Sequence, residues 1–418
     1  MRKGILIVLL LILAGAGGWY FYTKSKVATT EEQPTILKSF FPLGTTVPNT
    51  TPDGSLAPSS SNPISIPTQQ ATLFTQQSPS AVAGYSTLTN TYVVTTPAAT
   101  KKGKPTKQTF VDHVVRYVSR TNGYVYEIKN GSTPTQISNI YIPNIYEALF
   151  ADAGKTAIVR FLRDDARTIA SYSIPIPDPN PDDTRTQKDG VYLPDAISTL
   201  VIPTFDSTTL LRMTEEAGTT VLSSTTTKNT LRKELFRTPF HEWLLATGGK
   251  SIYLQTKASA VSEGFLYQLD QSKKRLVRVL GNTLGLTTSV SPNGTYVLYS
   301  TSTKSGVATK ILSTKTGVSR VVGTNILPEK CVWLKNEDLI CAGGGSIPEG
   351  VYPDDWYSGI VHFSDQLLRI YTASNTFDVL STPTENYSFD MTNLQVDDAM
   401  EHLFFIDKTT GILWRFTL

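Results

Sequence analysis

The sequence predicts an all-β fold, a single β-propeller of about seven four-stranded blades, and two observations carry this prediction. Residues 284–322 contain four short runs of strand-forming residues separated by tight turns, the pattern of one antiparallel sheet. Turns of the same kind recur at spacings of about 41 to 61 residues, close to the repeat length of a propeller blade. One blade cannot bury both of its faces, so repeated blades imply a ring. An irregular pair of β-sandwiches is the alternative.

The clearest unit is organised by the turn Ser-Pro-Asn-Gly at residues 291–294. Proline presets the backbone φ angle and the Asn-Gly pair tolerates positive φ, so the chain is expected to reverse there. The β-branched and aromatic run 296–299 follows as a strand, and residues 307–312 and 318–322 supply the next two.

A turn precedes the predicted second strand of every unit. The turns are at residues 112–113, 152–155, 206–207, 248–250, 293–294, 336–338 and 397–398. The second strands are predicted at residues 114–118, 157–162, 209–213, 251–255, 296–299, 339–341 and 402–406.

Residues 291–300, Ser-Pro-Asn-Gly-Thr-Tyr-Val-Leu-Tyr-Ser, resemble the Ser-Pro-Asp-Gly-Lys element of WD-like propeller repeats. Such repeats occur in TolB-type periplasmic proteins and in the propellers of prolyl-oligopeptidase-like enzymes. Asn293 stands where that element has Asp, and the pattern extends more loosely over residues 110–418. The resemblance implies a propeller and leaves the function open, because one fold carries many functions.

The start of the chain predicts a membrane anchor. Residues 4–22 carry no charge and are long enough to cross a hydrocarbon core, and residues 19–22 form an aromatic belt. We therefore expect an uncleaved transmembrane signal anchor at residues 1–23, with the body outside the cytoplasm. A cleaved signal peptide is the alternative, because residues 14–16 are small.

Residues 24–84 are predicted to form a linker. They are rich in Pro, Thr, Ser and Gln, with few charges, and such a segment cannot bury enough surface to fold. It would hold the body roughly 40 Å from the membrane. Residues 40–43, Phe-Phe-Pro-Leu, are either a stray apolar patch or a short docking motif.

The body is predicted to span residues 85–418 and to be closed by its own first strand. Only three strands of the last blade are found near the end of the chain, at residues 391–396, 402–406 and 411–418. A ring has no open sheet edge only if another segment supplies the fourth strand. The alternating run at residues 85–95 is the predicted closing strand.

One insertion has the spacing of a calcium-binding loop. Oxygen-bearing residues occur at the positions that bind Ca²⁺ in such loops, but Asp183 replaces the usual turn Gly, and the last position is Asp rather than Glu. A solvated acidic loop is the alternative. The weak candidate ligands are Asp178, Asn180, Asp182 and Asp189.

Cys331 and Cys341 are predicted to form a disulfide. Both lie five residues from Asn336, the centre of a predicted hairpin, so they face each other across two strands. An exported chain with two cysteines favours a disulfide. Zinc is not favoured, because no histidine or second cysteine pair accompanies them.

The segment at residues 343–359 is longer than a blade turn requires and combines Gly, carboxylates and aromatic residues. Long loops on a rigid scaffold commonly carry binding, and Tyr and Trp are frequent contact residues. Alternatively, Trp356 and Tyr357 cap the neighbouring blade. The candidate contact residues are Tyr352, Asp354, Asp355, Trp356 and Tyr357.

No catalytic motif is found in the sequence. The four histidines, at positions 113, 241, 362 and 402, have no metal partner at strand or helix spacing, so we interpret them as structural. No Gly-x-Ser-x-Gly nucleophile elbow occurs. The acid pairs at residues 164–165, 354–355 and 397–398 could act as glycosidase carboxylates only if two of them met in one pocket.

Together these patterns predict a membrane-anchored, extracytoplasmic propeller that serves as a protein-interaction scaffold in the cell envelope. A glycan- or ligand-binding propeller is the first alternative, and a glycan hydrolase or lyase with carboxylates in the central channel is the second. The expected partners are the membrane, through the N-terminal helix, and an envelope protein or glycan. The net charge of +3 does not favour nucleic acid, and no cofactor is expected.

Overall fold

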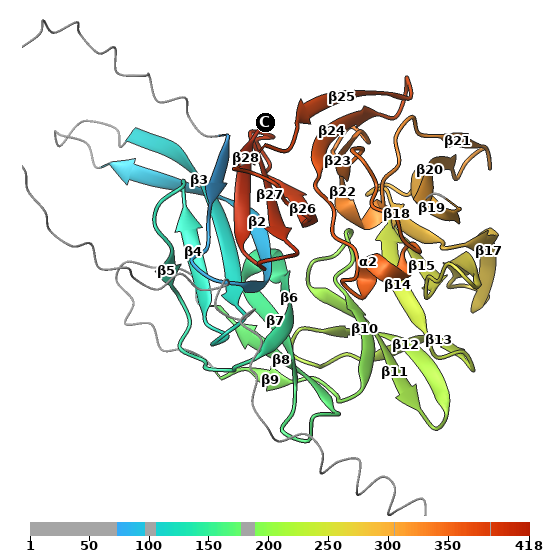
Figure 1. The fold of residues 1–418 in the computed structure, drawn as a ribbon. Coiled ribbons are helices and arrows are strands. Elements are labelled where there is room, and N and C mark those ends of the chain that lie inside the picture. Colours follow the sequence, from blue (N-terminus) through green and yellow to red (C-terminus); the bar gives the residue numbers. More distant parts are fainter. Residues whose placement is uncertain (1–72, 97–105, 177–188, 305, 385) are drawn as a thin grey trace, which may run out of the picture. The chain divides into compact units, whose positions relative to one another are not determined.

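The computed structural model describes residues 73–96, 106–176, 189–304, 306–384 and 386–418. These residues form seven antiparallel sheets of four strands each, and the sheets are the blades of one β-propeller (Figure 1). In six blades the four strands follow one another in the sequence, and the seventh blade borrows one strand from the N-terminal side. The predicted fold and blade number are confirmed.

The first four blades contain the following strands, given from the centre of the ring outward. Blade 1 is β2 (Val82–Thr96), β3 (Thr106–Ser119), β4 (Val125–Lys129) and β5 (Thr135–Gln136). Blade 2 is β6 (Ile145–Ala151), β7 (Thr156–Leu162), β8 (Ile169–Pro175) and β9 (Val191–Tyr192). Blade 3 is β10 (Ile197–Val201), β11 (Thr209–Glu216), β12 (Thr219–Thr226) and β13 (Lys233–Thr238). Blade 4 is β14 (Trp243–Gly248), β15 (Ser251–Thr256), β16 (Glu263–Asp270) and β17 (Arg275–Leu284).

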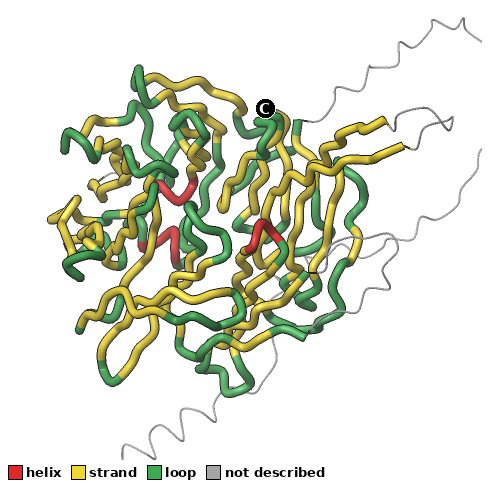
Figure 2. Tube along the Cα trace, turned by 180° about the vertical axis from the view of Figure 1, so that it is seen from behind, coloured by secondary structure: helices red, strands yellow, loops and turns green. Residues whose placement is uncertain are grey.

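The remaining blades complete the ring. Blade 5 is β18 (Thr287–Val290), β19 (Tyr296–Thr303), β20 (Gly306–Ser313) and β21 (Ser319–Val321). Blade 6 is β22 (Cys331–Trp333), β23 (Leu339–Gly343), β24 (Gln366–Tyr371) and β25 (Thr376–Ser381). Blade 7 is β26 (Met391–Val396), β27 (His402–Asp407), β28 (Leu413–Thr417) and β1 (Phe74–Gln76). Among these residues, helical structure is limited to short segments (Figure 2): η1 (Asp152–Gly154), η2 (Pro328–Lys330) and α2 (Asp354–Tyr357).

The second strand of each blade is the part that the sequence predicts best. All seven predicted second strands lie within β3, β7, β11, β15, β19, β23 and β27. In β7, for example, the first five residues are all buried, because neighbouring blades cover both faces of the sheet. A strand buried on both faces becomes a continuous apolar run, which is easy to recognise. Apolar clusters accordingly fill the spaces between successive blades.

The turn chemistry of blade 5 is also confirmed. Gly294 adopts a φ of 78°, and the side chain of Asn293 accepts a hydrogen bond from the Thr295 amide at 2.9 Å. By contrast, the turn predicted at residues 112–113 is wrong, because both residues lie inside β3. β2 and β3 extend well beyond the other strands of blade 1, and the two views show this hairpin projecting from the ring (Figures 1 and 2).

The prediction of the closing strand requires a correction. Residues 85–95 lie in β2, the first strand of blade 1, which pairs with β3. The ring is closed instead by β1, the blue strand beside β28 in Figure 1. Phe74 of β1 is opposite Phe416 of β28. β1 has only three residues and lies in a Ser- and Gln-rich stretch, so its packing, not its pattern, makes it a strand. The linker predicted at residues 24–84 is therefore too long, since residues 74–76 and 82–84 belong to the propeller.

The predicted anchor at residues 1–23 lies outside the described residues, as do Asp178, Asn180 and Asp182 of the predicted calcium loop. Within the described ranges, no helix has both the length and the apolar character that crossing a membrane requires.

Candidate functional site

The long segment predicted to bind a partner connects β23 to β24 and contains α2; we call residues 344–365 the blade 6 loop. Tyr352 is fully buried and Trp356 is almost so, whereas Tyr357 is exposed. The two buried rings belong to an apolar cluster beneath the loop. Its other buried members are Val307, Leu327 and Val361. Tyr352 and Trp356 thus hold the loop in place, and neither ring is on the surface.

The two predicted carboxylates also brace the loop. Asp354 Oδ2 accepts a hydrogen bond from the amide of Ala260, in the adjoining connection of blade 4, at 2.7 Å. Asp355 Oδ2 accepts one from the Val351 amide, also at 2.7 Å. Both side chains are partly exposed. The loop is therefore fixed to itself and to blade 4 by charge-assisted hydrogen bonds.

A buried lysine lies beneath the loop. Lys330 has no solvent exposure, and its Nζ is 2.5 Å from Asp390 Oδ1 and 2.8 Å from Asp365 Oδ2. It also donates to the backbone oxygen of Met391 at 3.0 Å. A buried charge is tolerated only with such partners, because leaving water is costly. These contacts join the end of blade 5, the loop and the start of blade 7.

The indole ring of Trp356 covers this charged group. Its Nε1 donates to Asp390 Oδ2 at 3.1 Å, and Lys330 Nζ lies 5.3 Å from the centre of the indole ring. Lys408 of blade 7 lies over the same ring at 4.5 Å and donates to the Trp356 carbonyl. Burial raises the pKa of Asp365 to about 6, although Lys330 opposes the shift. The loop therefore covers a charge cluster whose side chains have no solvent exposure.

The outer side of the loop exposes apolar side chains. Val351, Tyr357 and Ile360 are 50%, 44% and 74% exposed, and Val261 of the adjoining blade 4 connection is 84% exposed. The hydrogen bond from Ala260 to Asp354 joins the two connections. We call these four residues the blade 6 ridge. Of the predicted contact residues, Tyr357 alone belongs to it.

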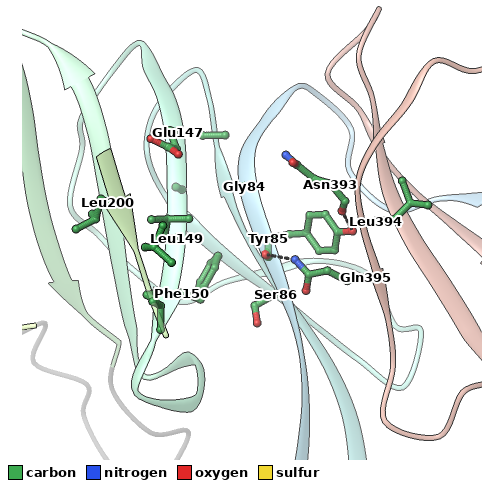
Figure 3. A pocket seen from close by; sticks show the side chains of 14 residues that line it. Gly84, Tyr85, Ser86, Glu147, Leu149, Phe150, Leu200, Asn393, Leu394 and Gln395 are labelled. Atoms are coloured by element: carbon green, nitrogen blue, oxygen red, sulfur yellow. Dashed lines mark hydrogen bonds between the residues drawn. The ribbon is translucent and has the colours of Figure 1, made fainter. Parts of the chain in front are cut away.

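A cavity of about 400 Å³ occupies part of the central channel (Figure 3). Its wall is formed by the innermost strands of four blades, β2, β6, β10 and β26. Gly84 lets two of these strands approach closely, since a Cβ there would lie 2.0 Å from the Ala148 oxygen. The polar side chains of the wall are Ser86, Glu147, Asn393 and Gln395.

The wall of this cavity does not bring together the acid pairs that were named as possible glycosidase carboxylates. Among the described residues that line the cavity, Glu147 is the one carboxylate, and its Oε2 is 2.6 Å from the guanidinium of Arg160. Residues 354–355 lie in the blade 6 loop, and residues 397–398 follow β26. A two-carboxylate mechanism needs both groups in one pocket, which these residues do not provide.

The predicted disulfide is present. Cys331 and Cys341 are bonded, and they are register partners in β22 and β23 with Cα atoms 4.0 Å apart. The equal spacing of five residues on either side of Asn336 is sufficient to place them opposite each other. Nothing comparable signalled the Lys330 cluster, because its charged residues lie in separate connections.

The histidines occupy different environments. His402 Nδ1 lies 2.9 Å from Asp397 Oδ2, and His362 Nδ1 lies 3.7 Å from Asp390 Oδ2. His113 lines the same small cavity as His402, described below. No group of three or more His, Cys, Asp or Glu side chains in the described ranges is placed to hold a metal ion.

The projecting hairpin of blade 1 is a second surface feature. We call residues 89–96 and 106–113 the blade 1 arm. β4 pairs with β3 only from Val114 onward, so the arm has two strands. Its apolar residues are 37% to 55% exposed, and the rings of Tyr92 and Phe110 stack at 5.7 Å. These exposed residues are Tyr92, Val93, Val94, Phe110 and Val111.

Neither the family models nor the curated proteins give a match to this sequence. Similar solved structures include TolB from Acinetobacter baumannii, with 12% identity over 64% of this chain and 61% of TolB and a TM-score of 0.41. The match therefore spans less than two thirds of TolB. An oligogalacturonate lyase in complex with manganese has 9% identity over 81% of this chain and 98% of its own, with a TM-score of 0.49. The propeller domain of the Trilobed protease from Pyrococcus furiosus has 11% identity over 78% and 89%, with a TM-score of 0.44.

These similarities carry no argument about activity. The propeller that the resemblance of residues 291–300 implies is confirmed at the level of the fold. The fold itself is established by the seven four-stranded sheets of the described residues.

Proposed function

We propose that this protein is a membrane-anchored, extracytoplasmic scaffold that binds another protein of the cell envelope through the blade 6 ridge. The observation that carries the proposal is the construction of the ridge. Four apolar side chains are exposed on connections that are fixed from below by buried charges and buried rings. Protein-binding surfaces commonly have such apolar centres.

The rigidity of the ridge favours a binding role. Ordering a mobile loop on association costs free energy, and a loop that is already ordered avoids this cost. The blade 6 loop is held by Asp354, Asp355 and Trp356 through hydrogen bonds within the chain itself. Its exposed residues are therefore preorganised for contact.

The extracytoplasmic location is proposed from the apolar residues 4–22 and from the disulfide. A disulfide persists in an oxidising compartment and is rare in the cytosol. The bonded pair Cys331–Cys341 supports export. The uncharged N-terminal segment supports anchoring to the membrane.

A small-ligand function is the second candidate, and the central cavity favours it. Its wall presents hydroxyl, amide and carboxylate groups together with buried apolar side chains, a combination suited to a polar ligand such as a sugar. The ridge suits a sugar less well, because three of its four side chains are aliphatic. A hydrolase or lyase has the least support.

Paired substitutions on the two faces of the ring test the proposal. Val261→Ser with Ile360→Ser removes two exposed ridge residues without disturbing the buried cluster. The matched control is Leu231→Ser with Val318→Ser, which are also exposed. The control residues lie in connections between third and fourth strands, at the opposite ends of the third strands from the ridge connections.

Each variant is produced as the full chain, and its partners are captured from detergent-solubilised membranes and quantified by mass spectrometry. We expect the ridge variant to recover at least tenfold less of a specific envelope protein than the control variant recovers. Equal recovery by both variants would refute the ridge as the binding surface. Glycan-array binding by both variants, together with equal protein recovery, would favour the second candidate.

A further inference from the structure

A smaller cavity lies where the ring closes, between blade 7 and blade 1. Its volume is about 230 Å³, and its lining comes from β3 and β4 on one side and from β27 and β28 on the other. His113 and Arg415 line it from opposite blades. Neither the proposed protein binding nor the channel uses this cavity, which we call the seam site.

Two side-chain nitrogens at the seam site lack partners. Arg415 Nε and His113 Nδ1 are buried and form no hydrogen bond within the described part of the chain. In the same ranges, Arg415 is paired with no carboxylate. A buried polar group without a partner is costly, so an unpaired guanidinium nitrogen in a residue that lines a cavity indicates a missing acceptor.

The acceptors nearby are already engaged. Asp397 accepts hydrogen bonds from the Glu401 amide at 2.8 Å and lies 2.9 Å from His402 Nδ1. The Asn130 side chain accepts from the His113 amide at 2.8 Å. The remaining polar residue of the wall, Gln77, donates to the backbone oxygens of Thr75 and Gln76. None of these side chains forms a hydrogen bond with Arg415 in the described ranges, and an anion from solution would supply the acceptor.

The wall also has an apolar part. Val115, Ile128 and Phe404 line the cavity and are all buried. A ligand that fits must therefore combine an anionic head with a short hydrocarbon part. The volume excludes a large molecule, since typical drug-sized sites begin at about 300 Å³.

We infer that the seam site binds a small monocarboxylate. The guanidinium of Arg415 and the imidazole of His113 receive the carboxylate, which matches the planar fork of arginine. The hydrocarbon part packs against Val115, Ile128 and Phe404. Such a ligand contacts both blade 1 and blade 7, so its binding stabilises the closed ring by mass action.

Benzoate and its neutral isostere benzamide test the inference on the full chain. We expect benzoate to bind in calorimetry and to raise the melting temperature, whereas benzamide does neither. Equal binding of benzamide would overturn the role of the anionic head. Inorganic phosphate binding as tightly as benzoate would overturn the role of the apolar wall.

Substitutions locate the site. Arg415→Gln and His113→Gln are each expected to weaken benzoate binding at least tenfold. Arg369→Gln is the matched control, because Arg369 also has a buried Nε without a partner but lies in blade 6, outside the seam site. Circular dichroism verifies that each variant is folded. If Arg415→Gln does not fold, the binding measured for His113→Gln tests the site instead. Unchanged binding in a folded variant of either seam residue would contradict the assignment.

Discussion

The blade 6 loop and the blade 1 arm both depart from the plain four-stranded blade, and both expose apolar side chains, but they are supported differently. The loop lies over Lys330, Asp365 and Asp390, with Trp356 sealing the group. The arm is a two-stranded hairpin that extends beyond β4. An isolated two-stranded hairpin is marginally stable at best. Exposed apolar area alone therefore does not identify a preorganised surface; what lies beneath it does.

The difference bears directly on binding. A partner that docks on the ridge meets side chains that are already fixed, whereas a partner that docks on the arm must also order the arm. For this reason we assign the proposed protein binding to the ridge. The following expectations separate the two regions, from the largest effect to the smallest.

Removing the buried lysine is expected to have the largest effect. Lys330→Met leaves two buried carboxylates without their cation, which costs about 3–5 kcal/mol of the free energy of unfolding. Chemical denaturation measures this loss. The matched control on the arm, Lys107→Met, is expected to change the free energy by less than about 0.5 kcal/mol. Similar values for the two variants would contradict the role given to the buried cluster.

The closing strand offers a second contrast with the arm. Phe74 is buried against Phe389 and Phe416, with ring centres 5.2 Å and 4.9 Å away. Phe74→Ala should therefore cost about 3–4 kcal/mol in the free energy of unfolding. Phe110→Ala on the arm should cost below about 1 kcal/mol, because its ring is partly exposed. A larger loss for Phe110 would reverse the comparison.

The pH dependence of stability should reveal the buried carboxyl beneath the loop. The pKa of Asp365 is about 6 in the folded protein and about 3.9 in an unfolded chain, so the folded state binds the proton more tightly. Its contribution to stability is thus fully present below about pH 4 and is lost as the pH rises to about 6.

Asp365→Asn removes this titration. Relative to the wild type, the variant should gain on the order of 1–3 kcal/mol between pH 4 and 6, measured by denaturation at each pH. Parallel stability curves for the two proteins would contradict a raised pKa.

Shortening the arm is expected to have the smallest effect. Asn90 and Asp112 are register partners, so an Asn-Gly turn can replace residues 91–111. The free energy of unfolding should change by less than about 0.5 kcal/mol, and partner recovery should be unchanged. Loss of the partner in this variant would move the binding surface from the ridge to the arm.

The contrast also explains how far the sequence could predict this molecule. Second strands such as β7 and β19 were found because both of their faces are buried, which leaves a continuous apolar run after a turn. The disulfide was found because residues on opposite sides of a tight hairpin obey a spacing rule. Both are local patterns.

The parts that were missed depend on distant contacts. β1 has three residues, and its identity as a strand rests on pairing with β28 at the far end of the chain. The binding prediction for the blade 6 loop named Tyr352 and Trp356, but an irregular loop has no periodicity that distinguishes inward from outward aromatic residues. Lys330 finds its partners 35 and 60 positions later, in Asp365 and Asp390, and no sequence pattern joins them.

Site-specific photo-crosslinking in intact cells tests the central claim most directly. A photoreactive residue is placed at Ile360 on the ridge, at Val93 on the arm and at Val318 on the opposite face, all of which are exposed. The account predicts one dominant protein adduct from position 360 and little from positions 93 and 318. An adduct from position 93 or 318 that equals or exceeds the one from position 360 would contradict it.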